Sequence, residues 1–384
     1  MKKLVRITTV PLSLEKLLED QPQYFAQFYD VTLISSDQER LERLGKAQGV
    51  ATHAIPLTRT ISPFHDLRCL YQMVRFFKRE KPDIVHTHTP KAGIIGMLAA
   101  YMARVPVKMH TVAGLPLMEA KGFKRRLLMA VEKITYRCAD WVYPNAKGLL
   151  SFIEENQMCS SSKIKILGKG SSNGIDTAFF DPIHMPKAET NTLKANLKIA
   201  PEDFVFSFVG RLVGDKGVNE LVEAFVLLSE QYPNIKLLLV GPEEKALDPL
   251  NRETTQHISA HPSIISVGYQ NDIRPYLAVS DCFVFPSYRE GFPNVVLQAA
   301  AMEVPCIVSN INGCNEIIQD QKNGWWVPPK SVTPLAQTME EALTNSVKRK
   351  AFKKQLRPQI IAHYGRQHFW ELLKKEYQSQ LKHV

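Results

Sequence analysis

The chain has 384 residues, of which 45% are hydrophobic and 22% are charged, and its formal net charge is +10. This composition excludes a disordered chain, and the length suits two domains of ordinary size. The positive charge favours an acidic partner: a nucleic acid, an anionic lipid or a phosphorylated small molecule. Six cysteines are scattered without a Cys-x-x-Cys pair, which predicts reduced thiols in a cytoplasmic protein and neither a disulfide framework nor a zinc site.

The chain begins with MKKLVRITTV, which is basic and then apolar like a signal peptide. The apolar run is short and rich in threonine, and no small-residue cleavage site follows, so we expect a first buried strand instead. The longest apolar run, residues 93–103, ends before Arg104 and Pro106. It is shorter than the roughly 18 to 20 residues that a bilayer requires, so we expect no transmembrane helix.

Short β-branched runs alternate with helical patterns along the whole chain. The predicted strands of the first half are residues 4–9, 30–35, 52–57, 83–88, 108–112, 141–145 and 163–167. Those of the second half are residues 203–210, 236–241, 263–268, 282–287, 305–309 and 324–328. Helical stretches such as 219–231 and 295–302 separate most of the strands. The pattern predicts an α/β protein with two doubly wound domains, each built on a parallel sheet.

The turn-rich segment 173–192 lacks periodicity and predicts the boundary between the two domains. We expect domains at 1–180 and 181–355, followed by a helical tail at 356–384 that packs back on the first domain. Pro358 predicts a break or kink in the helical pattern that begins at Lys348. Ligands of such sheets bind beyond the carboxyl ends of the strands, and the cleft between two domains is the default site.

The first strand end with unusual chemistry is VGRLVGDKG, residues 209–217. Arg211 and Lys216 can converge on one anion there, as the neutralisation of a diphosphate leaving group requires. The alternative is a surface turn with ordinary charges.

The second is SYREGFPNVVLQAAAMEVPCIVS, residues 287–309, where a strand turns into a helix. The free N–H groups of residues 291–294 at the helix start form an anion site. A carboxylate beside an anion site would repel a phosphate, so Glu290 is expected to accept hydrogen bonds from hydroxyl groups. Gln298 follows about two turns later on roughly the same face. Together they describe a nucleotide-sugar pocket, with a helix-capping role for Glu290 as the alternative.

Two further strand ends carry polar residues. In IVSNINGCNEII, residues 307–318, Gly313 allows a close backbone approach and Glu316 either caps the helix or contacts a ligand. In the first half, His86 and His88 have a spacing that could bind a metal, but no cysteine or carboxylate cluster accompanies them. His110 directly follows another strand, either as a hydrogen-bonding group at the cleft or as a core histidine.

Several motifs are missing from the sequence. It has no P-loop, no Gly-x-Gly-x-x-Gly after the first strand, no Gly-x-Ser-x-Gly and no Asp-x-Asp. We therefore expect no metal and no cofactor. Nucleic-acid binding is not expected either, because the chain lacks a reader motif and an aromatic platform.

Taken in chain order, the strand-end segments described above resemble those of the retaining glycosyltransferases of family 4, which have the two-domain GT-B fold. The resemblance covers the whole chain and is strongest at residues 173–176, 210–217, 240–244, 267–309 and 312–318. For catalysis it implies Arg211 and Lys216 on the donor diphosphate, Glu290 on the donor sugar, and His110 reaching that sugar from the first domain. The implied donor-binding residues are Gly210, Gly291, Phe292, Pro293, Asn294, Gln298, Gly313 and Glu316.

The sequence departs from the family pattern at two places. The family's second glutamate, which grips the ribose, is replaced by Gln298, so one charge-assisted hydrogen bond is lost and weaker binding is expected. The glycine-rich loop that usually follows the first strand is also missing from residues 7–17.

Residues 85–116 resemble a subgroup that builds bacterial surface glycans on a polyprenyl-diphosphate carrier, such as the transferase that adds N-acetylgalactosamine to lipid-linked bacillosamine. That resemblance implies a nucleotide-sugar donor, with UDP favoured over GDP, and a polyprenyl-diphosphate-linked acceptor. It also implies peripheral association with the anionic inner face of the cytoplasmic membrane. The residues expected on this side are His88, Lys91, Lys121, Lys124, Arg125 and Arg126.

Two other functions are compatible with the sequence. A non-hydrolysing sugar-nucleotide epimerase has the same architecture but needs acid and base groups arranged for water addition, and the motifs fit donor transfer better. A catalytically degenerate nucleotide-sugar-binding protein would explain Gln298, but Arg211, Lys216 and Glu290 argue against it.

Overall fold

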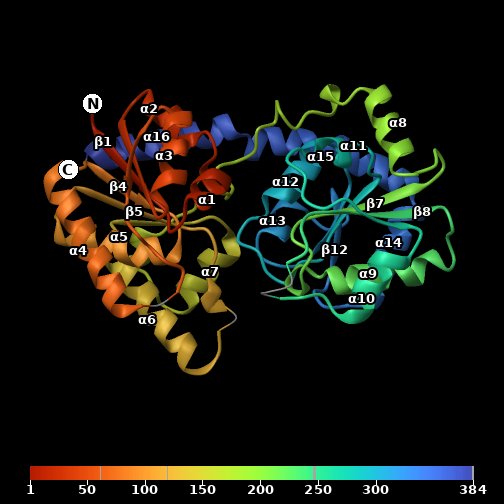
Figure 1. Cartoon of the computed structure of the whole chain (residues 1–384), viewed down its shortest axis with the longest axis horizontal. Coiled ribbons are helices and arrows are strands. Elements are labelled where there is room, and N and C mark those ends of the chain that lie inside the picture. Colours follow the sequence, from red (N-terminus) through yellow and green to blue (C-terminus); the bar gives the residue numbers. More distant parts are fainter. Residues whose placement is uncertain (61, 119, 245–247, 383–384) are drawn as a thin grey trace. The chain divides into compact units, whose positions relative to one another are not determined.

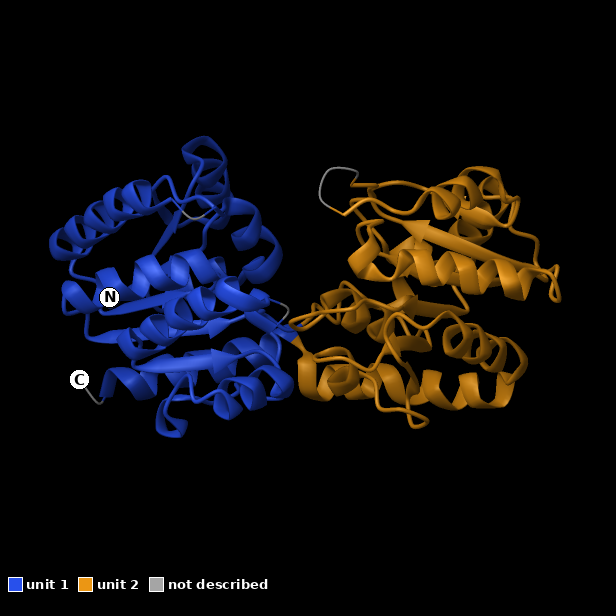
Figure 2. Cartoon of the chain, turned by 90° about the horizontal axis from the view of Figure 1, so that it is seen from below, with its two compact units in different colours: residues 1–174, 366–384 blue, residues 175–365 orange. Residues whose placement is uncertain are grey.

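A computed structural model describes residues 1–60, 62–118, 120–244 and 248–382. The chain divides into two compact units (Figure 2). Unit 1 comprises residues 1–174 and 366–384, and unit 2 comprises residues 175–365. Both are α/β units with a parallel six-stranded sheet, so the predicted doubly wound architecture is confirmed.

The sheet of unit 1 has the strand order β3-β2-β1-β4-β5-β6. The order reverses between β1 and β4, which makes the carboxyl ends of these two strands the topological switch point. The strands are β1 (Lys3–Ile7), β2 (Asp30–Ser35), β3 (Ala51–Ala54), β4 (Ile84–Thr87), β5 (Val107–Val112) and β6 (Trp141–Pro144).

Helices cover both faces of this sheet, which is why β4 is buried along its whole length (Figure 1). One face carries α1 (Pro11–Ser13), α2 (Gln21–Ala26), α3 (Gln38–Gln48) and α16 (Arg366–Lys382). The other carries α4 (Pro63–Glu80), α5 (Pro90–Met102) and α6 (Gly122–Cys138), and α7 (Lys147–Glu155) follows β6. Short helical turns lie at Leu14–Leu18, Pro116–Met118 and Ser161–Lys163.

The sheet of unit 2 repeats the same topology in the order β12-β11-β10-β7-β8-β9. Its strands are β7 (Phe204–Val209), β8 (Ile235–Val240), β9 (Ile264–Ser266), β10 (Cys282–Phe285), β11 (Cys306–Ser309) and β12 (Gly324–Val327). The switch point lies between β7 and β10, which pair in parallel.

The helices of unit 2 flank its sheet on two sides (Figure 1). One side holds α9 (Val218–Ser229), α10 (Arg252–Ala260) and α14 (Val332–Thr344). The other holds α8 (Lys187–Asn196), α11 (Arg274–Ala278), α12 (Asn294–Ala301), α13 (Cys314–Ile317) and α15 (Ser346–Tyr364). Short 3-10 turns lie at Pro182–His184 and Gly214–Lys216.

Two predictions about secondary structure are wrong. Residues 163–167 do not form a strand, because they touch β6 only through one bridge, Ile164 with Val142. The Lys165 side chain instead extends over the Trp141 ring, 4.4 Å from its centroid. The helix expected to break at Pro358 is continuous as α15, and the break lies at Gly365.

The unit boundaries lie at 174/175 and 365/366, in place of 180/181 and 355/356. The Arg357 side chain on α15 donates to the carbonyl oxygens of Phe180 (2.7 Å) and Thr177 (2.9 Å). The N–H of Ile175 donates to the carbonyl oxygen of Tyr364 at 2.8 Å. These hydrogen bonds join residues 175–180 to α15, so both segments belong to unit 2.

The final helix, α16, belongs to unit 1. Its residues Phe369, Trp370, Leu373 and Tyr377 lie in the same hydrophobic core as Phe25 of α2. Within the described residues, no helix combines the length and the apolar character that crossing a membrane requires.

Candidate active site

The candidate site of unit 2 lies at its switch point, where the loops after β7 and β10 touch. Gly217 ends the first loop with φ of 70°, a conformation that favours glycine. A Cβ atom at Gly217 would lie 2.2 Å from the carbonyl oxygen of Pro286, which follows β10. The missing side chain therefore lets the two loops pack against each other.

An ion pair joins these two loops. Lys216 Nζ lies 2.5 Å from Glu290 Oε1, and the Ser287 hydroxyl donates to the same oxygen at 2.8 Å. The Lys216 and Glu290 side chains are 17% and 15% exposed. Charges at such partly buried positions interact more strongly than they would in water. The sequence placed both residues at one site, and the structure brings them into direct contact.

A third loop, after β11, supports the turn that contains Glu290. The Asn312 amide donates to the carbonyl oxygens of Glu290 (3.0 Å) and Gly291 (2.8 Å). A Cβ atom at Gly313 would lie 2.4 Å from the Gly291 oxygen, so only glycine fits there without a shift. The structure thus brings the strand-end segments 287–294 and 312–316 together, as a shared pocket requires.

The helix α12 begins directly after this turn. Its N-cap is Pro293, which makes no side-chain capping hydrogen bond, and Asn294 is its first residue. The first N–H groups of a helix have no acceptor within the helix, so this end suits an anion. Phe292 is buried against the Tyr364 ring at a centroid distance of 5.5 Å, which fixes the start of the helix. Gln298 lies one turn after Asn294 and is partly buried.

The remaining donor-side residues surround this pair. Gly210 ends β7, and the Arg211 side chain that follows is 45% exposed and forms an ion pair with Glu244 after β8. Glu316 is the third residue of α13, and its carbonyl oxygen accepts a hydrogen bond from the Tyr364 hydroxyl at 3.2 Å. Each of the two candidate cations thus has a carboxylate partner, with which a diphosphate would compete.

His110 and His88 lie inside unit 1. His110 is 2% exposed, and its Nδ1 atom lies 2.7 Å from the Thr87 hydroxyl. Burial lowers the pKa of His110 to about 3, so the ring is neutral near pH 7. His88 is also buried and accepts a hydrogen bond from the Arg6 side chain at 3.0 Å. Burial lowers its pKa well below the ordinary value as well.

The other first-domain candidates lie on two helices of unit 1. Lys91, on the first turn of α5, forms an ion pair with Asp66 of α4. Lys121 is the N-cap of α6, and Lys124, Arg125 and Arg126 follow in its first two turns. Next to them, Phe123 is 80% exposed. Among the described residues, no group of three His, Cys, Asp or Glu side chains could hold a metal ion.

Sequence analysis missed Ser287 and Asn312, which hold the side chain and the backbone of Glu290. Both were visible as polar residues beside a strand end, but nothing in their spacing indicated a contact with Glu290. Their role depends on the order of β10 and β11 in the sheet.

Two protein-family models match the chain. The family model described as glycosyl transferases group 1 matches residues 189–359. A model described as a glycosyl transferase 4-like domain matches residues 21–168. Together the two matches cover most of both units.

Three named relatives resemble the chain. The capsular polysaccharide biosynthesis glycosyltransferase CapM of Staphylococcus aureus is 31% identical over 383 residues, which cover 99% of this chain and 98% of CapM. The UDP-Gal:alpha-D-GlcNAc-diphosphoundecaprenol alpha-1,3-galactosyltransferase of Escherichia coli is 30% identical, with 78% and 76% covered. The N,N'-diacetylbacillosaminyl-diphospho-undecaprenol alpha-1,3-N-acetylgalactosaminyltransferase of Campylobacter jejuni is 26% identical, with 72% of each chain covered.

Solved structures have the same fold. HepE of Anabaena in complex with UDP and glucose has a TM-score of 0.83 at 17% identity, with 99% of this chain and 100% of HepE covered. A glycosyltransferase from Rickettsia africae has a TM-score of 0.80 at 18% identity, with 100% and 99% covered. These likenesses confirm the predicted GT-B fold.

Proposed function

The chain belongs to the group 1 glycosyltransferases, family 4, and from this premise we propose that it transfers a hexose or an N-acetylhexosamine with retention of configuration. The proposed donor is a nucleotide sugar, with UDP favoured over GDP. The proposed acceptor is a saccharide on a lipid diphosphate, in the assembly of a bacterial surface polysaccharide or glycoprotein glycan. The names of the Escherichia coli and Campylobacter jejuni relatives, which act on undecaprenol-linked sugars, support this acceptor.

The observation that carries the proposal is the Lys216–Glu290 pair at the switch point of unit 2. When a donor binds, Lys216 exchanges the carboxylate for a diphosphate oxygen, and Arg211 does the same with Glu244. Glu290 is then available to accept hydrogen bonds from sugar hydroxyl groups. Ser287 and Asn312 keep it in place during this exchange.

Catalysis in this proposal rests on positioning and charge. The bond between the anomeric carbon and the diphosphate oxygen breaks, and the electron pair leaves with the nucleotide. Lys216, Arg211 and the start of α12 stabilise the negative charge that develops on the leaving group. The acceptor hydroxyl forms the new bond on the same face of the sugar, and its proton passes to the departing diphosphate oxygen.

Other residues have narrower proposed roles. Gln298 would contact the ribose hydroxyls as an amide, without the charge of the family's glutamate. His110 is neutral, so it is proposed as a hydrogen-bonding group for the donor sugar and not as an acid. Because His110 is only 2% exposed, that contact requires a shift of the surrounding side chains.

The first turn of α6 supports association with an anionic membrane surface, and we infer that the protein works at the inner face of the cytoplasmic membrane. Cations at a helix N-terminus are unfavourable because the helix dipole is positive there. Arg125 packs over the Phe152 ring at 5.6 Å, but this dipole does not favour Lys124, Arg125 or Arg126, and a role toward an anionic partner explains their charges better. The exposed Phe123 beside them suits insertion at the headgroup level.

A thermal-shift screen of the purified chain against UDP, GDP, CMP, NAD and their sugar conjugates tests the proposal. A ligand at a hundred times its Kd stabilises a protein by about 2.7 kcal/mol, which is measurable. Stabilisation by UDP or UDP sugars, followed by transfer of labelled sugar to a lipid-linked acceptor, is the expected result. Conversion of a UDP sugar into its epimer would establish the epimerase instead. Stabilisation by a nucleotide without transfer to any acceptor would favour the degenerate binding protein, and no response to any nucleotide would refute the proposed function.

A further inference from the structure

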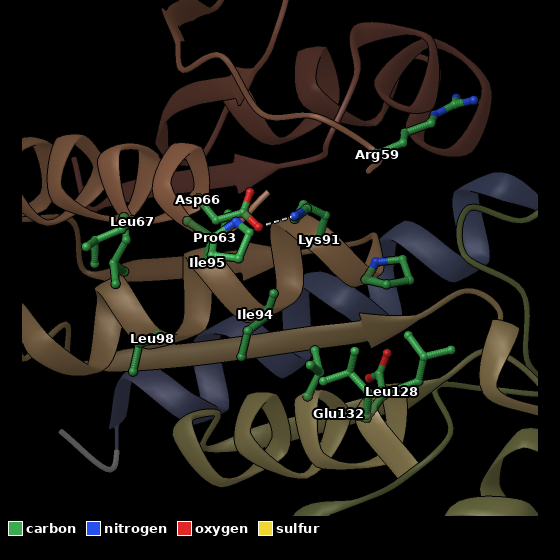
Figure 3. Close-up of a pocket in the computed structure, with 14 residues that line it drawn as sticks. Arg59, Pro63, Asp66, Leu67, Lys91, Ile94, Ile95, Leu98, Leu128 and Glu132 are labelled. Atoms are coloured by element: carbon green, nitrogen blue, oxygen red, sulfur yellow. Dashed lines mark hydrogen bonds and ion pairs between the residues drawn. The ribbon is translucent and has the colours of Figure 1, made fainter. Parts of the chain in front are cut away.

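A cavity of about 350 Å³ lies in unit 1, over α5 and between α4 and α6 (Figure 3). This volume is in the range of about 300 to 1,000 Å³ that is typical of small-molecule sites. The lining is largely apolar and includes Leu67 and Leu70 of α4, Ile94 and Leu98 of α5, and Leu128 and Val131 of α6. None of the residues used by the candidate site of unit 2 contributes to it.

The cavity exists because α5 is apolar on both of its faces. Gly93 and Gly96 face the sheet, where Cβ atoms would lie 2.6 Å from the His110 ring and from the Thr87 methyl group. Ile94 and Leu98 lie on the other face, one turn apart, and line the cavity. A surface helix normally presents polar residues on that side, so an apolar outer face indicates that something covers it.

An ion pair contributes to the lining of this cavity. Lys91 and Asp66 form an ion pair between α5 and α4, drawn as a dashed line in Figure 3. The pair is neutral as a whole. Glu132 of α6 also contributes to the lining, and burial raises its pKa to about 7. Arg59 also contributes to the lining and is exposed, so the lining carries a cation in addition to this ion pair.

Cations lie beside the apolar lining. Arg59, which contributes to the lining, is exposed. Lys124 precedes Leu127 and Leu128 by three and four residues on α6, so these three side chains lie on the same face of the helix. A second cation thus lies one turn from the apolar lining. An apolar cavity with these cations beside it matches a lipid that carries phosphate.

We propose that this cavity binds part of the hydrocarbon chain of the phosphate-linked lipid acceptor, with the phosphate close to the basic first turn of α6. This inference rests on the proposed function, because it assumes that the acceptor is lipid-linked. The proposed site in unit 1 takes the carrier chain out of the bilayer. It is separate from the surface contact that Phe123 and the basic residues make with the membrane.

The test compares farnesyl diphosphate with inorganic diphosphate by calorimetric titration of the full chain. We expect farnesyl diphosphate to bind at least tenfold more tightly. Leu98→Trp fills the cavity and should remove that difference, and the smaller change Ile94→Phe should reduce it. Tyr101→Trp is the matched control, because Tyr101 is an exposed residue of the same helix that does not line the cavity. It should bind like the wild type.

Either of two titration results would overturn the inference: equal binding of the two diphosphates, or an unchanged preference in Leu98→Trp. Sedimentation with anionic liposomes that lack polyprenyl lipids separates the carrier chain from ordinary bilayer lipid. If Leu98→Trp loses liposome binding together with farnesyl diphosphate binding, the cavity takes a bilayer acyl chain and the inference is wrong.

UDP stabilisation of each variant reports on folding and on the donor site. A retained UDP response without chain dependence refutes this site alone, whereas loss of all nucleotide binding by the wild type refutes the proposed function.

Discussion

The two units have the same strand order, but the switch points of their sheets are built differently. In unit 2, the loops after β7 and β10 meet through Gly217 and hold the Lys216–Glu290 pair near the surface. In unit 1, the corresponding ends of β1 and β4 are joined by Thr9 and Thr89, whose hydroxyl oxygens lie 2.7 Å apart. The same topology therefore gives a candidate anion site in one unit and a closed edge in the other.

The difference arises from glycine and from where the polar groups are satisfied. Residues 8–20, which follow β1, contain no glycine, so the chain there cannot make the close approach that Gly217 makes in unit 2. In unit 1, buried polar side chains near these strand ends bond to one another instead. Arg6 is fully buried, and it donates to His88 at 3.0 Å and to Gln21 at 2.5 Å. The strand order determines where a site can form, and the residues that follow the strands determine whether that site is open.

The largest expected effect comes from Lys216→Ala, which removes the cation at the open switch point. Because Lys216 is proposed to stabilise the departing diphosphate, we expect the rate of sugar transfer to fall by about 10² to 10³-fold. The measurement is the initial rate with a labelled UDP sugar. Lys322→Ala, which changes an exposed lysine of unit 2, should leave the rate unchanged. A loss of less than tenfold in Lys216→Ala would contradict the role of this residue.

The buried polar groups of unit 1 predict a strong dependence of its stability on pH. Burial lowers the pKa values of His86, His88 and His110 below 6.5, so these groups take up protons only on unfolding and their stabilising contribution is lost as the pH falls below 6.5. Glu132 acts in the opposite direction between pH 4.5 and about 7, because its pKa is raised. Below pH 6.5 the three histidines act together against the single Glu132, so unfolding takes up protons and the free energy of unfolding of unit 1 falls with the pH.

Hydrogen exchange of peptides from each unit at pH 7, 6 and 5, corrected for the intrinsic exchange rate, measures this difference. Unit 1 should lose protection faster than unit 2, whose His261 has a lowered pKa but is only partly buried. His110→Asn should reduce the slope for unit 1. Equal slopes in the two units would refute the prediction.

Neutralising the basic residues at the start of α6 tests whether unit 1, and not unit 2, binds an anionic membrane. With Lys124, Arg125 and Arg126 changed to Gln, binding to anionic liposomes should fall by about a hundredfold at low salt, since each cation contributes about 1 kcal/mol. The matched control changes Lys350, Lys353 and Lys354 of α15 in unit 2 to Gln and should bind like the wild type. Unchanged sedimentation of the α6 variant would exclude this turn as a membrane contact.

The smallest expected effect is that of Gln298→Glu. Restoring a carboxylate at the ribose position should tighten UDP binding about fivefold, because charge-assisted hydrogen bonds are stronger than neutral ones. Isothermal titration with UDP measures this change. Gln231→Glu adds the same charge at an exposed position and should have no effect. An unchanged affinity in Gln298→Glu would show that residue 298 does not contact the ribose.

Much of the fold was predictable because its determinants are local. Strand and helix periodicity identified each strand of both sheets, and the glycine, arginine and lysine of residues 210–217 indicated an anion site. The false strand at 163–167 has the same apolar alternation as a true one. It lacks a neighbouring strand along its length, and periodicity does not reveal that.

The sequence by itself determined the two doubly wound units and the family, since apolar periodicity and short motifs are properties of neighbouring residues. Only the tertiary structure decided that Lys216 contacts Glu290, 74 residues away, and that Asn312 supports the same turn. It also decided that His110 is buried, that α16 belongs to unit 1, and that α4, α5 and α6 enclose a cavity. Each of these depends on which strands and helices become neighbours, and that is set by the packing of the whole unit.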